Sequence, residues 1–415
     1  MSGSSLHVLI VGGGLGGLCL AQGLRQSGVS VTVYERDVTP AIRRQGYRLH
    51  IDARGANALR SCLPSHLFEL FLATASPPGH QITVMNHHLR KLKVIGSPTV
   101  DASNPTRFTA GVDRLTLREI LLADLEEVIS FGKAFQQYQF TDGKVQASFA
   151  DGTVATGDVL VAADGVHSRI RQQLLPQATL VDTGTRCIYG KVELSEAIRP
   201  LIPDALHHGF TVAVSRKLSL ALGLVEFRCP PAQAAAQLAP SVQFHSGGDY
   251  LMWSLNASRA LFAASDDELF RLNGTGLHHL VLKQIHTWHP TLRALIAASD
   301  PAEIFPIAVR TSVPCDPWPS APVTLLGDAI HAMSPAGGSG ANMALRDAQL
   351  LCETLTAIAQ GERPLLQAMH AYEAQMLKDG FEAVRFSTKG GVLAPSAPAK
   401  RSLLRPLLRG PRVSS

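Results

Sequence analysis

Three short runs of consecutive apolar residues organise the chain, and each ends in a glycine-containing turn. The runs cover residues 7–11, 159–163 and 323–326, and the turns that follow contain Gly12, Gly165 and Gly327. Their length and their content of valine, leucine and isoleucine indicate β-strands. Because the runs lack the alternation of a strand with one exposed face, they predict a parallel sheet that is buried on both sides.

The remainder of the chain shows three other patterns. Between residues 180 and 305, short β-rich stretches such as 186–194 and 250–255 alternate with polar turns, which predicts a second lobe built on a sheet. Residues 265–289 and 341–380 have helical periodicity. From residue 394 onward, proline, serine and basic residues dominate, which favours a flexible tail over 394–415. The overall pattern is that of an α/β protein.

Composition and charge limit the possible functions. Of the 415 residues, 46% are hydrophobic and 17% charged, so the chain is neither a disordered polyelectrolyte nor a coiled coil. Its net charge is +5, and subtracting the six basic residues that follow residue 388 leaves −1 for the rest. Those six are Lys389, Lys400, Arg401, Arg405, Arg409 and Arg412. We therefore expect no nucleic-acid surface over the body of the protein.

Cysteine spacing and hydropathy indicate the compartment. The two closest of the six cysteines, Cys315 and Cys352, are 37 positions apart, so no C-x-x-C pattern exists. Gly12 interrupts the first apolar run before it reaches the length of a signal peptide or a membrane span, and no other stretch is long enough. These features predict a cytoplasmic protein without a transmembrane segment.

The first turn carries a dinucleotide-binding pattern. Gly12, Gly14 and Gly17 form a G-x-G-x-x-G directly after a strand, and Leu15 opens a predicted helix that runs to about residue 26. A second strand over 29–34 leads to Glu35, 18 residues beyond Gly17. The glycines would let the backbone approach a pyrophosphate, and the carboxylate suits a ribose diol. The alternative is an ordinary strand-turn-helix with a surface glutamate.

The turn after the third run predicts a second ligand loop. Asp328 leaves a buried strand, and a glycine-rich segment from Pro335 to Asn342 leads into a helix that starts at about Ala341. A carboxylate there can accept hydrogen bonds from polyol hydroxyls, and the positive end of the helix can stabilise negative charge on a planar ring. FAD has both parts, a ribityl chain and an isoalloxazine. The alternative is a core helix that follows a proline-glycine loop.

Together these motifs resemble the class A flavoprotein monooxygenases, typified by p-hydroxybenzoate hydroxylase, and most of all the tetracycline-inactivating branch. The resemblance spans residues 6–380 and includes a third motif that begins at Asp164 and Gly165. It implies an α/β fold with a Rossmann-like FAD-binding domain, an inserted mixed-sheet substrate domain and C-terminal helices. We expect FAD-binding parts at 1–75, 106–178 and 306–393, and substrate-domain parts at 76–105 and 179–305.

The resemblance also assigns roles to individual residues. It implies that Glu35 holds the adenosine ribose, Asp328 the ribityl or pyrophosphate region, and the loop from Pro335 to Asn342 the isoalloxazine. The expected cofactor-binding residues are Gly12, Gly14, Leu15, Gly17, Glu35, Arg36, Arg44, Arg48, Arg114, Asp164, Asp328, Pro335, Gly338, Gly340, Ala341 and Asn342.

Some of these roles have alternatives. Arg114 matches a family arginine near the flavin, but it can also be a solvated helix charge. The segment at Asp164 is linked in the family to NADPH or NADH use, although an Asp-Gly is also a common turn in which Ser168 caps the next helix. Arg44 and Arg48, with the neighbouring Arg43, would bind the nicotinamide cofactor's phosphates, line the flavin pocket or be solvated.

The substrate is expected between the flavin loop and the second lobe. Cys187, Tyr189 and Lys191 share one strand face by alternation, and they match pocket-facing positions of the tetracycline-inactivating members. The alternative is a sheet face packed on helices. Arg216 and residues 305–306 are further candidates.

Several sequence features indicate which branch of the family is expected and whether a metal site is expected. Ser339 stands where many members have glutamine, and neither the extra domain of phenol hydroxylases nor the W-x-W-x-I-P pattern of flavin halogenases is found. His278, His279, His286 and His289 include an H-x-x-H spacing, but no carboxylate or thiol accompanies them at a ligand spacing, so we expect no metal. His331 is expected to be structural.

The predicted activity follows from flavin chemistry. NADPH or NADH would reduce FAD, molecular oxygen would add to form a flavin C4a-hydroperoxide, and one oxygen atom would hydroxylate an aromatic or polyketide-like small molecule. No side chain is assigned as catalytic. A Baeyer-Villiger or epoxidising enzyme and a non-catalytic, ligand-sequestering flavoprotein remain alternatives, and the sequence leaves the oligomeric state open.

Overall fold

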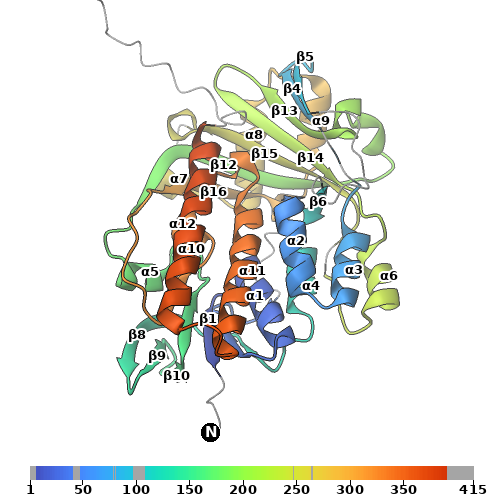
Figure 1. Cartoon of the computed structure of the whole chain (residues 1–415). Helices are drawn as coiled ribbons and strands as arrows, with labels where there is room; N and C mark the ends of the chain where they lie inside the picture. The colour runs from blue at the N-terminus through green and yellow to red at the C-terminus, as the bar shows by residue number, and fades with distance from the viewer. Residues whose placement is uncertain are drawn as a thin grey trace, which may run out of the picture.

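Two main sheets and a layer of long helices make up the fold, shown in Figure 1. The structure is a computed structural model that describes residues 6–40, 47–77, 79, 81–96, 108–245, 247–262 and 265–389. Arg44 and the tail 394–415 lie outside these residues.

The first sheet is parallel, and its strands follow the order β17-β11-β1-β2-β7. Its strands are β1 (His7–Val11), β2 (Ser30–Tyr34), β7 (Ile129–Ser130), β11 (Val159–Ala162) and β17 (Val323–Leu325). The three apolar runs are adjacent strands in it, and β11 and β17 are buried along their whole length. The predicted α/β class with a Rossmann-like parallel sheet is confirmed.

Long helices pack on this sheet, and Figure 1 shows α1, α2, α11 and α12 side by side. The helices that share the hydrophobic core of this sheet are α1 (Leu15–Gln26), α2 (Ala53–Cys62), α3 (Ser65–Thr74), α4 (Arg114–Leu122), α5 (Arg169–Leu174), α6 (Pro231–Leu238), α10 (Asp328–His331), α11 (Gly340–Ala359) and α12 (Leu365–Lys389). The helix predicted over 341–380 is divided into α11 and α12, because Gly361 has a φ of +76° and Pro364 precedes α12.

The second sheet has seven strands in the order β16-β12-β15-β14-β13-β4-β5. They are β4 (Gln81–Asn86), β5 (Lys91–Ile95), β12 (Leu180–Glu193), β13 (Gly209–Val214), β14 (Leu218–Val225), β15 (Tyr250–Ser258) and β16 (Phe305–Ser312). Ile188, Leu222 and Trp253 on one face form a core with α8 (Gly274–Gln284) and α9 (Pro290–Ala297). The opposite face carries Cys187, Tyr189 and Tyr250.

Smaller elements complete the described chain. They are β3 (Arg48–Asp52) paired with β6 (Thr109–Asp113), the sheet of β8 (Phe135–Thr141), β9 (Lys144–Phe149) and β10 (Val154–Gly157), helix α7 (Asp266–Arg271), and the 3-10 turns η3 (Arg199–Leu201), η4 (Asp204–Leu206), η5 (Arg259–Leu261), η6 (Pro301–Glu303) and η7 (Pro335–Gly337). The helix predicted over 265–289 is two helices, α7 and α8, because the Asn273 side chain caps a new start by accepting from Gly276 N–H.

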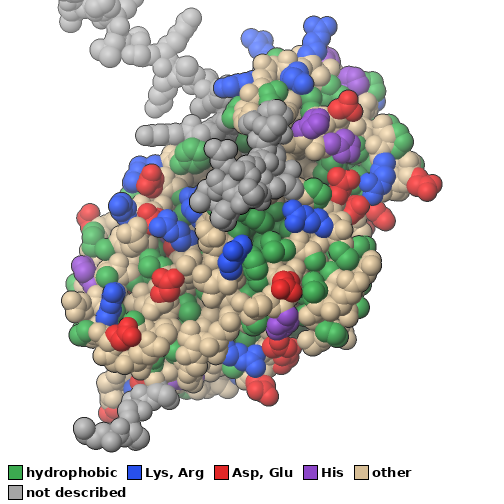
Figure 2. Space-filling model, turned by 45° about the vertical axis from the view of Figure 1, so that its right-hand side comes forward, with side chains coloured by type: hydrophobic (Ala, Val, Ile, Leu, Met, Phe, Trp, Pro, Cys, Tyr) green, Lys and Arg blue, Asp and Glu red, His purple; other side chains and the backbone are tan. Residues whose placement is uncertain are grey.

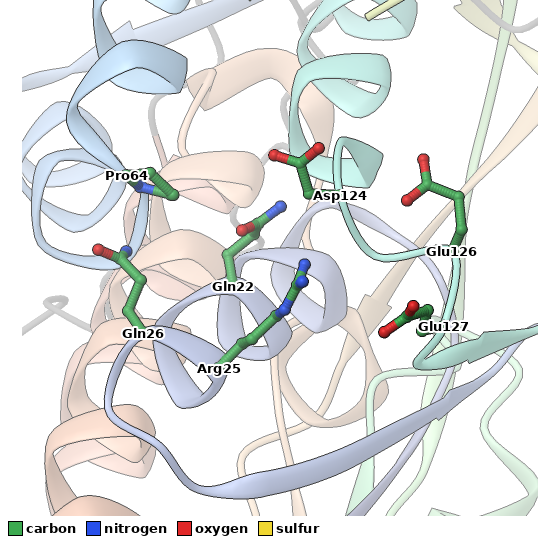
Figure 3. Close-up of a pocket in the computed structure, with 7 residues that line it drawn as sticks. All are labelled: Gln22, Arg25, Gln26, Pro64, Asp124, Glu126 and Glu127. Carbon is green, nitrogen blue, oxygen red and sulfur yellow. The ribbon is translucent and has the colours of Figure 1, made fainter. Parts of the chain in front are cut away.

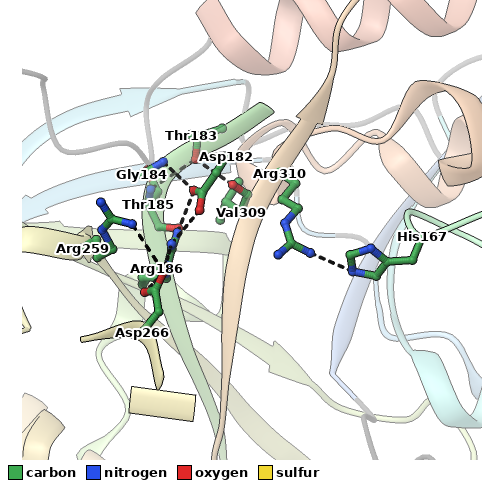
Figure 4. A network of polar contacts seen from close by, with 10 residues as sticks. All are labelled: His167, Asp182, Thr183, Gly184, Thr185, Arg186, Arg259, Asp266, Val309 and Arg310. Atoms are coloured by element: carbon green, nitrogen blue, oxygen red, sulfur yellow. Dashed lines mark hydrogen bonds and ion pairs between the residues drawn. The ribbon is translucent and has the colours of Figure 1, made fainter. Parts of the chain in front are cut away.

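A buried arginine ties the large sheet to α7. Arg186 on β12 is fully buried and forms ion pairs with Asp182 at 2.7 Å and Asp266 at 2.6 Å (Figure 4). The pairing register of β12 shifts between Asp182 and Arg186, which brings the two residues together. We interpret this network as structural, because both carboxylates compensate the buried charge.

The surface carries mixed charge, and Figure 2 shows basic and acidic side chains interspersed over the face in view. All six cysteines are free thiols. Among the described residues, no helix is long and apolar enough to cross a membrane.

Candidate active site

Four neighbouring strands of the parallel sheet end at residues that the sequence predicts to bind FAD. Strand β1 leads to Gly12, β2 to Glu35, β11 to Asp164 and β17 to Asp328. Because parallel strands end at the same edge of their sheet, these residues from four distant segments lie along one edge. That edge is the usual ligand site of open α/β sheets.

The glycine turn is shaped for a close ligand. Gly12 has a φ of +112°, and a Cβ there would overlap the Ala163 carbonyl group just after β11, while a Cβ on Gly17 would overlap the Gly12 carbonyl oxygen. A Cβ on Gly14, in contrast, would meet no atom within 4 Å, so this position is open. Gly14 precedes α1 without a side-chain cap, which leaves the first N–H groups of the helix for an anion such as a pyrophosphate. The residues present therefore fit a dinucleotide.

Two buried side chains hold this turn in place. Glu35 accepts hydrogen bonds from the N–H of Gly13 at 2.7 Å and of Asp37 at 3.0 Å. Arg118 donates from Nε to the carbonyl oxygen of Gly13 at 3.1 Å and from Nη1 to that of Pro40 at 2.9 Å. Arg118 lies one helical turn beyond Arg114 on α4, and it is not among the residues predicted from the sequence. Glu35 thus supports the glycine turn, in addition to its predicted role in binding the adenosine ribose.

Among the described residues, one carboxylate oxygen of Asp164 is buried without a hydrogen-bond partner. Its Oδ2 accepts from the N–H of Arg169 at 3.0 Å, whereas its buried Oδ1 has no hydrogen-bond partner among the described residues. Burial raises the pKa of this carboxyl. Such an orphaned oxygen suits a ligand hydroxyl. Ser168 caps α5 by accepting from Arg171 N–H at 3.0 Å.

Asp328 begins α10, and its side chain is exposed to solvent. Partial desolvation of the carboxyl group by the protein around it raises its pKa, against the opposing effect of the positive charges of His331 and Arg114. The Arg114 guanidinium lies 5.7 Å from the ring centroid of Tyr47. Arg114 is therefore directed toward the site and is only partly exposed. Arg36, in contrast, is exposed.

The loop from Pro335 to Asn342 is held by an amide clamp. Pro335 begins η7, Gly338 is left-handed with a φ of +60°, and Gly340 and Ala341 form the first turn of α11. Asn342 is fully buried and its Nδ2 donates to the carbonyl oxygens of His50 at 2.8 Å and Gly338 at 3.1 Å. Its Oδ1 accepts from Asp52 N–H at 2.9 Å. These three bonds go to backbone groups, so Asn342 ties the loop to β3.

A buried carboxylate on α11, Asp347, is not among the residues predicted from the sequence. Asp347 on α11 accepts from the N–H of Gly327 at 3.0 Å, and its Oδ2 lies 2.6 Å from His331 Nε2. Burial would lower the pKa of His331, but the adjacent Asp347 carboxylate raises it overall. The signal was present, because Asp347 is a charged residue within the apolar stripe of α11.

The expected substrate residues share one face of the large sheet. Tyr189 stacks on Phe305 with centroids 5.7 Å apart and contacts Tyr47 at 5.4 Å. Lys191 Nζ lies 3.8 Å from Asp113 Oδ2 and 4.6 Å from the Tyr250 ring centroid.

Other predicted residues lie apart from this group or within the packed sheet. Cys187 is buried, and burial raises the pKa of its thiol to about 12. Arg216 is exposed in the turn between β13 and β14, at the end of β14 opposite Val225. Arg48 lies on β3 and donates from Nε to the carbonyl oxygen of Leu224 at 3.0 Å.

The structure also shows features outside this site. A cavity of about 530 Å³ lies at the C-terminal end of α1, lined by Gln22, Arg25, Gln26, Pro64, Asp124, Glu126 and Glu127 (Figure 3). This is the end of α1 that lies away from the glycine turn. His278 contacts the Ile296 carbonyl oxygen and His289 caps α9. Among the described residues, no group of three metal-ligating side chains comes together.

Comparison with known proteins gives consistent matches. The family described as FAD binding domain matches residues 5–187 and 281–387. The dual O-methyltransferase/FAD-dependent monooxygenase CTB3 of Cercospora beticola is 33% identical over 90% of this chain, which spans only 44% of that protein. The FAD-dependent monooxygenase thnD of Trichoderma harzianum is 27% identical over 97% of this chain and 96% of that protein.

A solved structure agrees with these matches over nearly the whole chain. A Photorhabdus luminescens protein assigned as an FAD-containing monooxygenase superposes with a TM-score of 0.79 and is 33% identical. The match covers 93% of this chain and 97% of that one.

Proposed function

Because this chain belongs to the FAD-binding domain family of the class A flavoprotein monooxygenases, we propose that it is an NAD(P)H-consuming monooxygenase that hydroxylates an aromatic or polyketide-like small molecule. One observation carries this proposal. The loop from Pro335 to Asn342 is bonded to β3 through Asn342 and the His50 carbonyl oxygen, and Arg48 on the same strand contacts the large sheet, which has a face rich in aromatic side chains. The names of the relatives CTB3 and thnD, both FAD-dependent monooxygenases, support it.

The described residues would hold the cofactor in parts. The open glycine turn and the start of α1 would receive the pyrophosphate, Glu35 the adenosine ribose, and Asp328 the ribityl or pyrophosphate region. The start of α11 would face the isoalloxazine with uncapped N–H groups. When bound, FAD supplies hydride acceptance from NADPH or NADH and transfer of one oxygen atom from molecular oxygen.

The protein's own contribution is positioning and exclusion of water. Tyr47, Tyr189 and Phe305 present adjoining rings on the face of the large sheet. Such a surface keeps water from a reactive oxidant and aligns a flat substrate. This chemistry requires no side-chain nucleophile, and we assign no catalytic residue.

We assign the phosphates of the nicotinamide cofactor to a basic cluster beside Asp164. Arg310 on β16 donates to Nε2 of His167 at 2.7 Å (Figure 4). Burial lowers the pKa of His167, and the charges of Arg310 and Arg36 lower it further, so the ring is a neutral acceptor. Neither arginine forms an ion pair with a described residue. Two unpaired guanidinium groups suit a diphosphate.

A substitution tests this assignment. We expect Arg310→Met to raise the KM for NADPH by about tenfold or more, because a lost charge-assisted contact costs ~1.5 to 3 kcal/mol. FAD content should not change. Arg293→Met, at an exposed arginine on α9, is the matched control. If Arg310→Met instead releases FAD and leaves the KM unchanged, the cluster belongs to the FAD site.

The reaction itself is tested by oxygen labelling. A stopped-flow screen should find compounds that accelerate flavin reduction, and turnover under oxygen-18 should add one labelled atom as a hydroxyl group. A labelled ester or epoxide would identify the Baeyer-Villiger or epoxidising alternative. A ligand that binds tightly but never stimulates NAD(P)H oxidation would indicate a ligand-sequestering flavoprotein.

A further inference from the structure

Arg48 occupies a position that the proposed function leaves unused. Ile51 on β3 is fully buried in the main core, so alternation directs Arg48 and His50 to the opposite face of the strand. The His50 Cβ is 3.6 Å from where a Cβ on Gly338 would lie, and Asn342 binds the carbonyl oxygen of His50. The face of β3 that carries Arg48 is therefore the one next to the loop from Pro335 to Asn342.

Glycines on two neighbouring strands, Gly223 and Gly111, leave space for the Arg48 side chain. A Cβ on Gly223 of β14 would lie 2.8 Å from Arg48 Cδ, and a Cβ on Gly111 of β6 would lie 2.8 Å from its Nε. Real Cβ atoms do not approach other heavy atoms so closely, so any larger residue at either position would displace the arginine. The guanidinium lies 5.6 Å from the Phe210 ring centroid, and Nε is fixed by the Leu224 carbonyl oxygen. The side chain is thus held in one place.

Among the described residues, no acidic side chain neutralises this guanidinium. Arg48 forms no ion pair with any residue that the structure describes. Asp113, its partner in the β3–β6 register, is already engaged by Thr116 N–H and by Tyr250 Oη, each at 2.8 Å. Burial lowers the pKa of Arg48 to about 10, so the group is still charged at neutral pH. A partly buried cation without a counter-ion is costly, and an incoming anion would relieve that cost.

Aromatic side chains adjoin the guanidinium on the large sheet. We define the aromatic face as Tyr47, Tyr189, Phe210, Tyr250 and Phe305, which belong to one apolar cluster. The rings of Tyr189 and Phe305 are stacked and nearly parallel, with an angle of 12° between their planes. A flat ring packs well on such a surface, while a group at its edge reaches an arginine.

We propose that Arg48 determines specificity by pairing with an acidic group, a carboxylate or an ionised phenol or enol, on a planar aromatic substrate that packs on the aromatic face. This inference rests on the proposed function. The contacts of Arg48 favour a substrate over a cofactor phosphate. They are to Leu224 and Phe210 of the large sheet, whereas Arg310 lies on β16, which two strands separate from β14. The glycine turn, the expected pyrophosphate site, follows β1 of the parallel sheet.

The test compares acids with their methyl esters. Calorimetry on the FAD-loaded protein at pH 7.5 would measure the binding of salicylate, 1-hydroxy-2-naphthoate and anthraquinone-2-carboxylate, each beside its methyl ester. For at least one pair, we expect the acid to bind about tenfold or more tightly than the ester, as a charge-assisted contact implies. Arg48→Gln should remove this difference and leave ester affinity and FAD content unchanged. Arg48→Lys should keep part of it, and Arg293→Gln all of it.

The outcomes separate this inference from the proposed function. If no acid binds the parent protein more tightly than its ester, Arg48 does not select an anion, and this result stands even if both variants fail to fold. If Arg48→Gln releases FAD or raises the KM for NADPH, the arginine serves a cofactor. If acids and esters stimulate NADPH oxidation equally, the enzyme assignment stands and the inference is wrong. Charge discrimination without any stimulated oxidation would leave the inference and remove the enzyme assignment.

Discussion

At Asp328, one side chain is expected to bind FAD and to destabilise the ligand-free fold. Partial desolvation by the surrounding protein raises its folded-state pKa above the ordinary value of about 3.9, so the folded protein binds this proton more tightly than the unfolded chain does. Its contribution to stability therefore falls as the pH rises through that window, and the charged form costs stability at neutral pH.

This predicts opposite effects of Asp328→Asn on stability and on binding. The melting temperature of the apoprotein at pH 7 should stay equal or rise, while FAD affinity should fall by ~1.5 to 3 kcal/mol because a hydrogen bond to a charged group is lost. Thermal unfolding of the apoprotein and quenching of FAD fluorescence measure the two effects. Asp142→Asn, in the exposed turn between β8 and β9, is the control. A destabilised apoprotein with unchanged FAD affinity would show that Asp328 is structural.

Local motifs were predictable at this scale, and distant supports were not. Gly12 and Asp164 follow apolar runs directly, and Asp328 follows one after Gly327, so their places at strand ends follow from the sequence. Arg118 supports Gly13 from 105 positions away, and only the fold brings the two together. The binding roles of the predicted residues, from Glu35 to Asn342, stay predictions.

At the scale of elements, the pair of His331 and Asp347 joins α10 to α11. The folded-state pKa of His331 is raised above about 6.5, because the Asp347 carboxylate outweighs burial. The protonated pair therefore contributes its full stability below that pH and loses it as the pH rises through the raised pKa. The same carboxylate orients Gly327, which precedes Asp328.

Asp347→Asn should remove this pH dependence. At pH 6 we expect a loss of ~3 to 5 kcal/mol in the free energy of unfolding, because the variant leaves a buried imidazolium without its partner. The difference between parent and variant should shrink toward pH 9. Chemical denaturation at both pH values measures it, and FAD content reports the effect on the Gly327 turn. Parallel curves for the two proteins would contradict a charged pair.

Element types were predicted better than their ends. Strand β1 and helix α1 match the predicted ranges because a glycine marks each boundary. The long helical stretches were each divided, at Gly361 and at Asn273, because a helix period continues across a break that only the backbone conformation reveals. The short strands β3 and β6 were missed, since neither is a continuous apolar run.

For the whole molecule, the sequence predicts the class of fold, but strand pairing between distant segments decides the composition of the large sheet. Strand β4 pairs in parallel with β13, more than 120 residues later, and so adds β4 and β5 to the large sheet. No local pattern encodes that pairing, because it depends on which exposed strand edge is available. The domain boundaries and the flexible tail over 394–415 stay predictions, and the tail lies outside the described residues.

The central claim is that one edge of the parallel sheet, with the start of α11, binds FAD. In their predicted roles, the glycine turn and Glu35 would bind only a flavin that carries an adenosine diphosphate half, so the cofactor should be FAD and not FMN. Mass spectrometry of the compound released from the purified protein by heat tests this most directly. We predict FAD at close to one molecule per chain. Release of FMN alone, or a refolded protein that binds neither flavin, would contradict the assignment.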